Sequence, residues 1–184
     1  MILLIHGPPA SGKSTLASQL SKSLKLPHIS RDNLCEWMND FLNNPDSKTA
    51  QELTHIGYDL MFKLLGELSK GLGSFIIEGC INPDSSSERI LKLIKDSPQD
   101  LVEIFVSADQ DTLINRYLNR SKSIKRHNAH GAESKRGEEL RQHLNQCIYR
   151  PLEISPYSIK IDNSIDPSST IEIALNFLKQ NKLT

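Results

Sequence analysis

Hydrophobic residues gather along the chain in short runs that are separated by longer amphipathic stretches. The runs are too short for helices and suit strands that are buried in a sheet. The clearest runs cover residues 2–5, 74–79 and 101–108, and the stretches PHIS (27–30) and YSIKIDN (157–163) are interpreted as two further short strands. Between them, apolar residues recur every three or four positions, as they do on one face of an α-helix. The alternation predicts an α/β fold with a parallel sheet that helices cover on both faces.

The amphipathic stretches place the expected helices. They cover residues 13–24, 31–41, 49–70, 85–94, 109–120 and 170–178. Two helix starts carry sequence signals, Ser85–Glu88 and the capping-box pattern Ser169–Glu172. No Gly-, Pro- or Ser-rich linker divides the 184 residues, so one domain spanning 1–184 is expected.

The first strand runs directly into the stretch GPPASGKST, which fits the pattern G-x-x-x-x-G-K-[ST]. Glycines let the backbone bend so that its N–H groups converge on phosphate oxygens. The lysine and the serine hydroxyl then serve the terminal phosphates and Mg²⁺. A glycine-rich turn without a ligand is the alternative interpretation. The predicted nucleotide-binding residues are Gly7, Pro8, Pro9, Ala10, Ser11, Gly12, Lys13, Ser14 and Thr15.

Several classes of nucleotide or nucleic-acid protein do not fit the chain. A GTPase switch would need N-K-x-D and D-x-x-G, and neither is present. Motor and transporter ATPases usually end the relevant strand in Asp-Glu, whereas this third strand ends in IIEG. With 22 basic and 22 acidic residues the net charge is zero, which excludes a general polyanion binder. The short spacing between elements favours a small phosphotransferase.

Four motifs in order, GPPASGKST, SRDNL, IIEGCIN and INRYLNR, resemble the P-loop kinases grouped around polynucleotide 5′-kinase. More distantly, the chain is similar to chloramphenicol phosphotransferase, zeta-toxin, gluconate kinase and adenylate kinase. The resemblance implies a three-layer P-loop NTPase fold with a five-stranded parallel sheet in the order 2-3-1-4-5. It also implies ATP and Mg²⁺ as cofactors and transfer of the γ-phosphoryl group to a hydroxyl.

The resemblance assigns two carboxylates. Asp32 follows the second strand where that family keeps its catalytic Asp, which would accept a proton from the attacking hydroxyl. The alternative is that Asp32 only caps a helix. Glu78 ends the third strand where the family commonly has Asp, and it would hold the Mg²⁺ shell through water, beside Ser14.

The basic segment 116–136 lies where related kinases place a mobile lid. Arg116 and Arg120 are four residues apart, so they share one helix face. By resemblance, Arg116 lies near the adenine and Arg120 reaches the phosphates, where cations stabilise the transferring group. A solvated charged surface is the alternative. The other basic residues of the segment are Lys122, Lys125, Arg126, Lys135 and Arg136.

The acceptor is less well defined. Polynucleotide kinases carry an Arg three residues after the catalytic Asp, whereas this chain has Cys35. Residues 33–62 hold five acidic residues and only one lysine. A small hydroxylated molecule, a nucleoside, a nucleotide or an antibiotic is therefore expected. The acidic side chains of this region fit a neutral or cationic acceptor. A polynucleotide 5′-hydroxyl kinase and a nucleotide-binding regulatory module remain as alternatives. Trp37 would either stack on an acceptor or pack in the core.

The remaining features predict an unexceptional setting. Cys35, Cys80 and Cys147 are far apart and form no C-x-x-C pair, so buried or incidental thiols in a reducing compartment are expected. No targeting segment or membrane span is visible, which favours a cytoplasmic protein. We expect a monomer or a homodimer.

Overall fold

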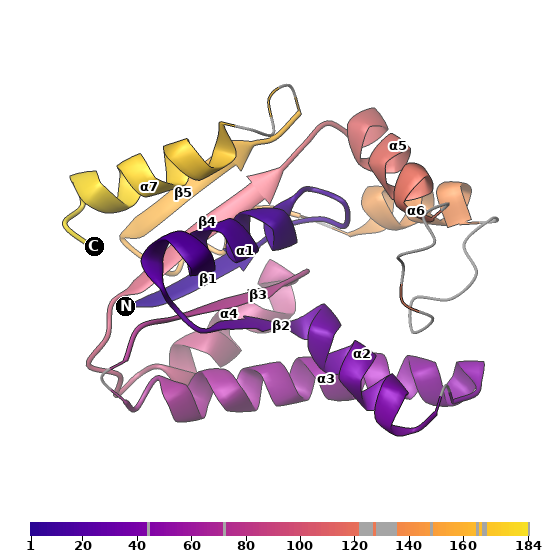
Figure 1. Ribbon diagram of the computed structural model, residues 1–184, viewed down its shortest axis with the longest axis horizontal. Coiled ribbons are helices and arrows are strands. Elements are labelled where there is room, and N and C mark those ends of the chain that lie inside the picture. The colour runs from indigo at the N-terminus through magenta and orange to yellow at the C-terminus, as the bar shows by residue number, and fades with distance from the viewer. Residues whose placement is uncertain are drawn as a thin grey trace.

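The computed structural model describes the chain except residues 44, 72, 122–126, 128–135, 148, 165, 167–168 and 184. Five parallel strands form one sheet, ordered β2-β3-β1-β4-β5 (Figure 1). The class and the strand order are those expected. The strands are β1 (Ile2–His6), β2 (His28–Ser30), β3 (Phe75–Gly79), β4 (Leu101–Ser107) and β5 (Tyr157–Asp162).

Helices cover both faces of this sheet and extend beyond its carboxyl edge. In Figure 1, α1 and α7 lie over one face, α3 and α4 lie over the other, and α5 and α6 lie beyond the strand ends. Most of the predicted lid, 116–136, lies outside the described residues. The helices are α1 (Lys13–Leu24), α2 (Arg31–Phe41), α3 (Ser47–Leu68), α4 (Pro83–Leu93), α5 (Gln110–Ser121), α6 (Arg136–Gln146) and α7 (Thr170–Gln180).

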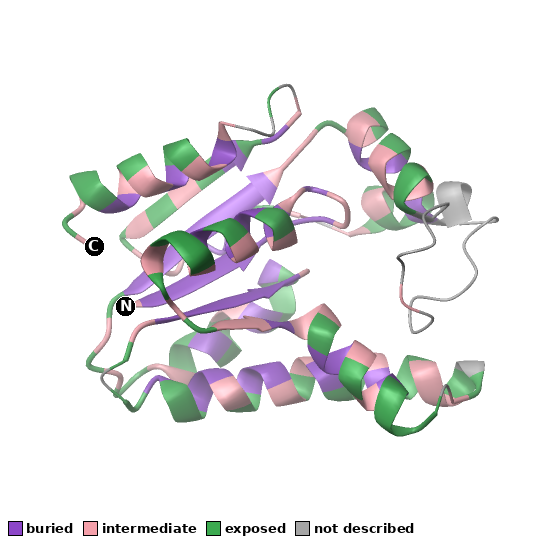
Figure 2. Cartoon of the chain, in the orientation of Figure 1, coloured by how far each residue is buried: buried purple, intermediate pink, exposed green. Residues whose placement is uncertain are grey.

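The central strand β1 explains why the apolar runs are continuous. Ile2 and Leu4 pack into the core with α3 and α4, whereas Leu3 and Ile5 pack into the core with α1 and α7. Successive side chains of a strand point to opposite faces, so a strand covered on both sides needs apolar residues at every position. Figure 2 shows the buried strands between the two helical layers. Within the described residues, no helix is long and apolar enough to cross a membrane.

The helix start predicted at Ser85–Glu88 is wrong because α4 begins earlier, whereas Ser169 is the N-cap residue of α7, as the capping-box pattern predicted. Helix α4 begins at Pro83, and the Asn82 side chain caps it by accepting from the Asp84 amide at 2.9 Å. Proline suits the first helical turn because it has no N–H that would need a partner. Ser169 precedes α7 but makes no side-chain cap bond, because its backbone is already helical instead of extended.

Glu103 is a carboxylate buried within β4. His6 and the Leu152 amide lie 2.8 and 2.5 Å from its Oε1, and the Ser158 hydroxyl donates to its Oε2 at 3.0 Å. Burial alone would raise the pKa of Glu103, but the hydrogen bonds from His6 and Leu152 lower it below its ordinary value. Glu103 therefore fixes the segment between α6 and β5 to the sheet.

We expect Glu103→Gln to lower the free energy of unfolding by about 3 kcal/mol at neutral pH. Because the pKa of Glu103 is lower in the folded state, its stabilisation is complete above the unfolded pKa. That stabilisation is lost as the pH falls through the folded value. Urea unfolding across a pH series measures the difference, which should shrink below pH of about 4.

The matched control is Glu67→Gln on α3, where an exposed carboxylate pairs with Lys70. This variant should change the stability by less than about 1 kcal/mol. A wild-type advantage over Glu103→Gln that stays constant down to acid pH would contradict the assignment.

Candidate active site

The loop between β1 and α1 has a backbone that only glycine accommodates at two positions. Gly7 and Gly12 have φ of 151° and 94°, outside the range that other residues favour. A Cβ atom on Gly7 would collide with the Val106 carbonyl oxygen, and one on Gly12 would collide with the Asn163 amide. Ala10 also adopts a left-handed conformation, with φ of 61°. The loop is thus wound tightly between the ends of β4 and β5.

Lys13 is the first residue of α1, and its side chain turns back over this loop. The residue is 5% exposed, and its Nζ donates to the Pro8 carbonyl at 3.2 Å. Burial alone would lower the pKa of Lys13, but the nearby Cys80, Glu78 and Asp32 raise it above its ordinary value. The ammonium therefore stays charged at neutral pH, beside the helix N-terminus that favours anions.

The side-chain oxygens of Ser14 and Glu78 lie within hydrogen-bond distance of each other beside the loop, and we call them the oxygen pair. The Ser14 hydroxyl donates to Glu78 Oε1 at 3.0 Å, and Glu78 is 1% exposed at the end of β3. Burial alone would raise the pKa of Glu78, but His28 and Lys13 lower it below its ordinary value. Among the described residues, Glu78 Oε2 has no hydrogen-bond partner, and His28 Nε2 is 3.8 Å away.

This oxygen pair fits a magnesium ion. Mg²⁺ prefers hard oxygen ligands and commonly keeps several waters, so it needs few protein groups. Within the described part of the chain, no group of three or more His, Cys, Asp or Glu side chains could form an all-protein metal cage. Ser14 as a direct ligand, and Glu78 directly or through water, are the residues that could hold the ion.

Asp32 occupies the second position of α2, close to the same loop. The residue before the helix is Ser30, so Asp32 is not the N-cap. Its Oδ1 accepts from the Arg31 guanidinium at 2.9 Å, and that guanidinium also lies over the Tyr58 ring, 4.7 Å from its centre. Asp32 is near enough to Lys13 to raise the pKa of the ammonium. A carboxylate, an ammonium and an oxygen pair thus converge at one edge of the sheet.

The loop after β5 contributes a residue that the sequence did not single out. The Asn163 side chain donates to the Ser11 carbonyl at 2.7 Å, and its backbone carbonyl accepts from Arg116 at 2.8 Å. Asn163 therefore links the phosphate loop to Arg116 of α5. Arg120 is exposed one turn further along α5, and Arg126 lies outside the described residues.

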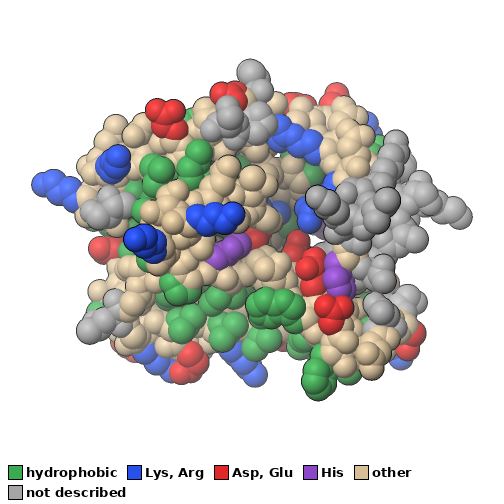
Figure 3. Space-filling model, in the orientation of Figure 1, with side chains coloured by type: hydrophobic (Ala, Val, Ile, Leu, Met, Phe, Trp, Pro, Cys, Tyr) green, Lys and Arg blue, Asp and Glu red, His purple; other side chains and the backbone are tan. Residues whose placement is uncertain are grey.

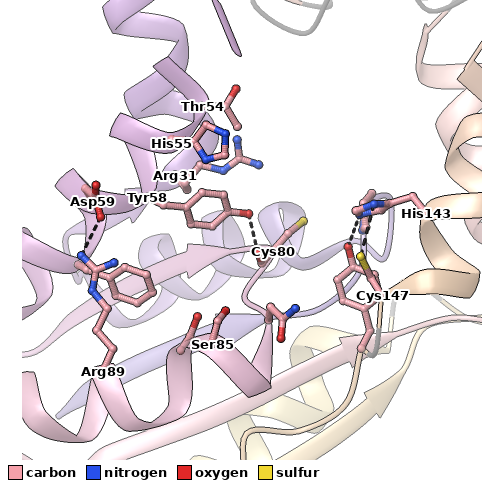
Figure 4. A pocket seen from close by; sticks show the side chains of 15 residues that line it. Arg31, Thr54, His55, Tyr58, Asp59, Cys80, Ser85, Arg89, His143 and Cys147 are labelled. Carbon is pink, nitrogen blue, oxygen red and sulfur yellow. Dashed lines mark hydrogen bonds and ion pairs between the residues drawn. The ribbon is translucent and has the colours of Figure 1, made fainter. Parts of the chain in front are cut away.

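A cavity of about 610 Å³ opens beside the phosphate loop, between α3, α4 and the end of α6 (Figure 4). The Tyr58 hydroxyl donates to the Cys80 carbonyl at 2.6 Å. The Arg89 guanidinium donates to Asp59 at 2.8 Å. The lining residues are Pro9, Arg31, Thr54, His55, Tyr58, Asp59, Phe62, Cys80, Asn82, Ser85, Ser86, Arg89, His143, Cys147 and Tyr149.

The side chains that line the cavity are less acidic than the number of acidic residues in 33–62 suggests. Asp59 is the one member of that acidic group that lines the cavity, and Arg89 neutralises it. Arg31 lines the cavity as well. Trp37 is 63% exposed, so it does not pack in the core, and it is not among the residues that line this cavity. Figure 3 shows hydrophobic side chains gathered over the region of α2 and α3.

Comparison with known proteins identifies the family. Residues 2–144 match the family model described as AAA domain. No significant match is found among curated proteins.

Solved structures share the fold over nearly the whole chain. A provisionally assigned kinase from Chloroflexus aurantiacus is 23% identical, with a TM-score of 0.83, covering 97% of this chain and 96% of that one. A gluconokinase from Sinorhizobium meliloti is 14% identical, with a TM-score of 0.62, covering 97% and 91%. Shikimate kinase from Bacteroides thetaiotaomicron is 16% identical, with a TM-score of 0.62, covering 100% and 99%. The chain therefore belongs to the AAA domain family and has the fold of the P-loop kinases.

Proposed function

We propose that the protein is an ATP- and Mg²⁺-dependent phosphotransferase that moves the γ-phosphoryl group of ATP to a hydroxyl of a small molecule. One observation carries the proposal: Lys13, the Ser14–Glu78 pair and Asp32 converge where the phosphate loop borders a cavity of about 610 Å³. The gluconokinase and shikimate kinase neighbours support a small acceptor, because both are named for small hydroxylated acids.

The proposed roles follow from the positions of the groups. The loop amides and Lys13 bind the β- and γ-phosphates. Bound Mg²⁺, held by Ser14 and by Glu78, would neutralise charge on the same phosphate oxygens. Asp32 accepts the proton of the attacking hydroxyl. Arg116 lies near the base and Arg120 serves the phosphates when the segment 116–136 closes as a lid.

The cavity lining favours a compact polar acceptor. Hydroxyl and amide groups from Thr54, Asn82 and Ser85 line it together with the ring of Tyr58. These groups suit a molecule that has both hydroxyls and an apolar face. The volume falls within the range of small-molecule sites, so a sugar, a hydroxy acid or a nucleoside would fit.

Cys35 weakens the alternative of a polynucleotide kinase. It stands where those enzymes carry an arginine, and it is buried, with its thiol 3.6 Å from the Leu53 carbonyl. It therefore offers a strand phosphate neither charge nor access. Only a measurement of turnover distinguishes an enzyme from a regulatory module that binds a nucleotide without transferring its phosphate.

The test is an acceptor screen with ATP labelled at the γ-phosphate, read by mass spectrometry. Hydroxylated acids, sugars, nucleosides and a 5′-hydroxyl oligonucleotide form the panel. We expect phosphorylated product from a small molecule and none from the oligonucleotide. Preferred transfer to the oligonucleotide would favour the second function, and tight MgATP binding with no product from any acceptor would favour the regulatory module.

A further inference from the structure

The end of α6 brings a thiol, an imidazole and a phenol together on the wall of the large cavity. Cys147 Sγ lies 3.4 Å from His143 Nδ1, and His143 Nε2 lies 2.8 Å from the Tyr149 hydroxyl oxygen. All three residues line the cavity, and Figure 4 shows His143 and Cys147 across it from Arg31 and Tyr58. The proposed phosphoryl transfer uses none of these three groups.

The geometry allows the imidazole to act as a base toward the thiol. Burial and the nearby thiols raise the pKa of Tyr149 above its ordinary value, so the phenol keeps its proton at neutral pH. In the tautomer protonated at Nε2, His143 donates to the Tyr149 oxygen and leaves Nδ1 free to accept the Cys147 proton. A nucleophile, a base and a group that orients the base form the arrangement that activates a weak nucleophile.

The other two cysteines have different surroundings. Cys35 is 5% exposed, and burial raises the pKa of its thiol above the ordinary value. Cys80 lines the same cavity, but it interacts with the ammonium of Lys13. Cys147 is also accessible from a second cavity of about 410 Å³, which lies against the end of β4 and the start of α5. It is the thiol that combines access with a neighbouring imidazole.

We propose that Cys147 is a modification site for low-molecular-weight disulfides. His143 Nδ1 takes the thiol proton, and the Cys147 thiolate attacks one sulfur of the disulfide. A new S–S bond forms, the old one breaks, and the leaving thiolate takes the proton from His143. Cys147 is oxidised and one half of the reagent is reduced. The adduct then occupies the acceptor cavity and leaves the nucleotide loop open, a consequence that rests on the proposed function.

The experiment treats the full chain with glutathione disulfide at neutral pH and follows the adduct by intact mass and peptide mapping. We expect one glutathionyl group on Cys147, none on Cys147→Ser, and an unchanged adduct on Cys80→Ser. The adduct should form on Cys147 about 10-fold more slowly in His143→Ala than in the wild type. The rate for Tyr149→Phe should lie between those two rates. Calorimetry should show that the adduct binds MgATP with the affinity of the unmodified protein. Turnover of an identified acceptor should fall at least about 10-fold in the adduct, and it should return when a thiol reductant removes the glutathionyl group.

Three results would overturn the proposal. One is an adduct on Cys35 or Cys80 with Cys147 unmodified. Another is a rate that His143→Ala does not change, because an incidental thiol would behave in that way. The third is a Cys147 adduct that binds MgATP weakly or that turns over acceptor at the rate of the unmodified protein. A screen that found no acceptor would overturn the proposed function but would leave the mapped site and its dependence on His143 intact.

Discussion

Asp32→Asn is expected to lower kcat by about 10²- to 10⁴-fold while leaving the affinity for MgATP close to that of the wild type. Asparagine keeps the shape of the side chain and can still accept from Arg31, which lies 2.9 Å from the carboxylate. It cannot take up a proton from the attacking hydroxyl. Steady-state turnover with an acceptor from the screen measures the loss, and calorimetry measures nucleotide binding.

The matched control for this variant is Asp59→Asn. Asp59 is a carboxylate that lines the proposed acceptor cavity, and it pairs with Arg89 at 2.8 Å. Its removal should raise KM for the acceptor with little change in kcat, because the group contacts no transferring phosphate. If Asp32→Asn and Asp59→Asn had the same kinetic effect, Asp32 would be an acceptor-binding residue and not the base.

Lys13→Ala is expected to weaken MgATP binding by about 100-fold or more. The ammonium is buried against the loop, bonded to the Pro8 carbonyl and held in its charged form by Glu78 and Asp32. Charge-assisted contacts to phosphate in such a site are each worth about 1.5–3 kcal/mol, which is a tenfold to hundredfold change in affinity. Isothermal titration calorimetry with MgATP measures the change.

Lys22→Ala is the control for Lys13→Ala, because Lys22 belongs to the same helix but is exposed in its last turn. It should bind MgATP as the wild type does. Circular dichroism should show that both variants are folded. Wild-type affinity in a folded Lys13→Ala variant would show that the nucleotide phosphates bind elsewhere.

The sequence pattern located the sheet well for a physical reason. Strands β1, β3 and β4 are buried almost throughout and must be mostly apolar, so they were visible as short hydrophobic runs, and the phosphate loop followed the first of them. The edge strands β2 and β5 are only partly buried and carry polar residues, so their apolar signal is weaker. The order of the strands is a different matter. Hydrophobic spacing does not determine which strands are neighbours, and the expected order came from the resemblance to P-loop kinases.

The elements that the sequence missed carry weak apolar signals. Helix α6 is strongly polar, and among its described side chains only Leu140 is a buried hydrophobic residue, so no amphipathic period marks it.

The role of Asn163 depends on loops that are distant in sequence and meet at the edge of the sheet. The charge of the cavity was misjudged for a similar reason, because a count along α2 and α3 does not show which side chains face inward.

The cysteines illustrate the same limit. Far-apart thiols without a C-x-x-C spacing were expected to be incidental, which fits the buried Cys35. Cys80 and Cys147, however, line one cavity, because β3 and the end of α6 meet beside the phosphate loop. His143 lies one helical turn before Cys147, a spacing that places the two side chains on the same face. That spacing was the available signal for the pair.

Calorimetric titration of the intact protein with ATP, first with Mg²⁺ and then with the metal chelated, tests the central claim most directly. A phosphate loop beside the Ser14–Glu78 oxygen pair should give saturable binding at one site, and chelation should weaken it by at least about 10-fold. A folded protein that releases no heat with MgATP, or that binds ATP equally well without the metal, would contradict the claim.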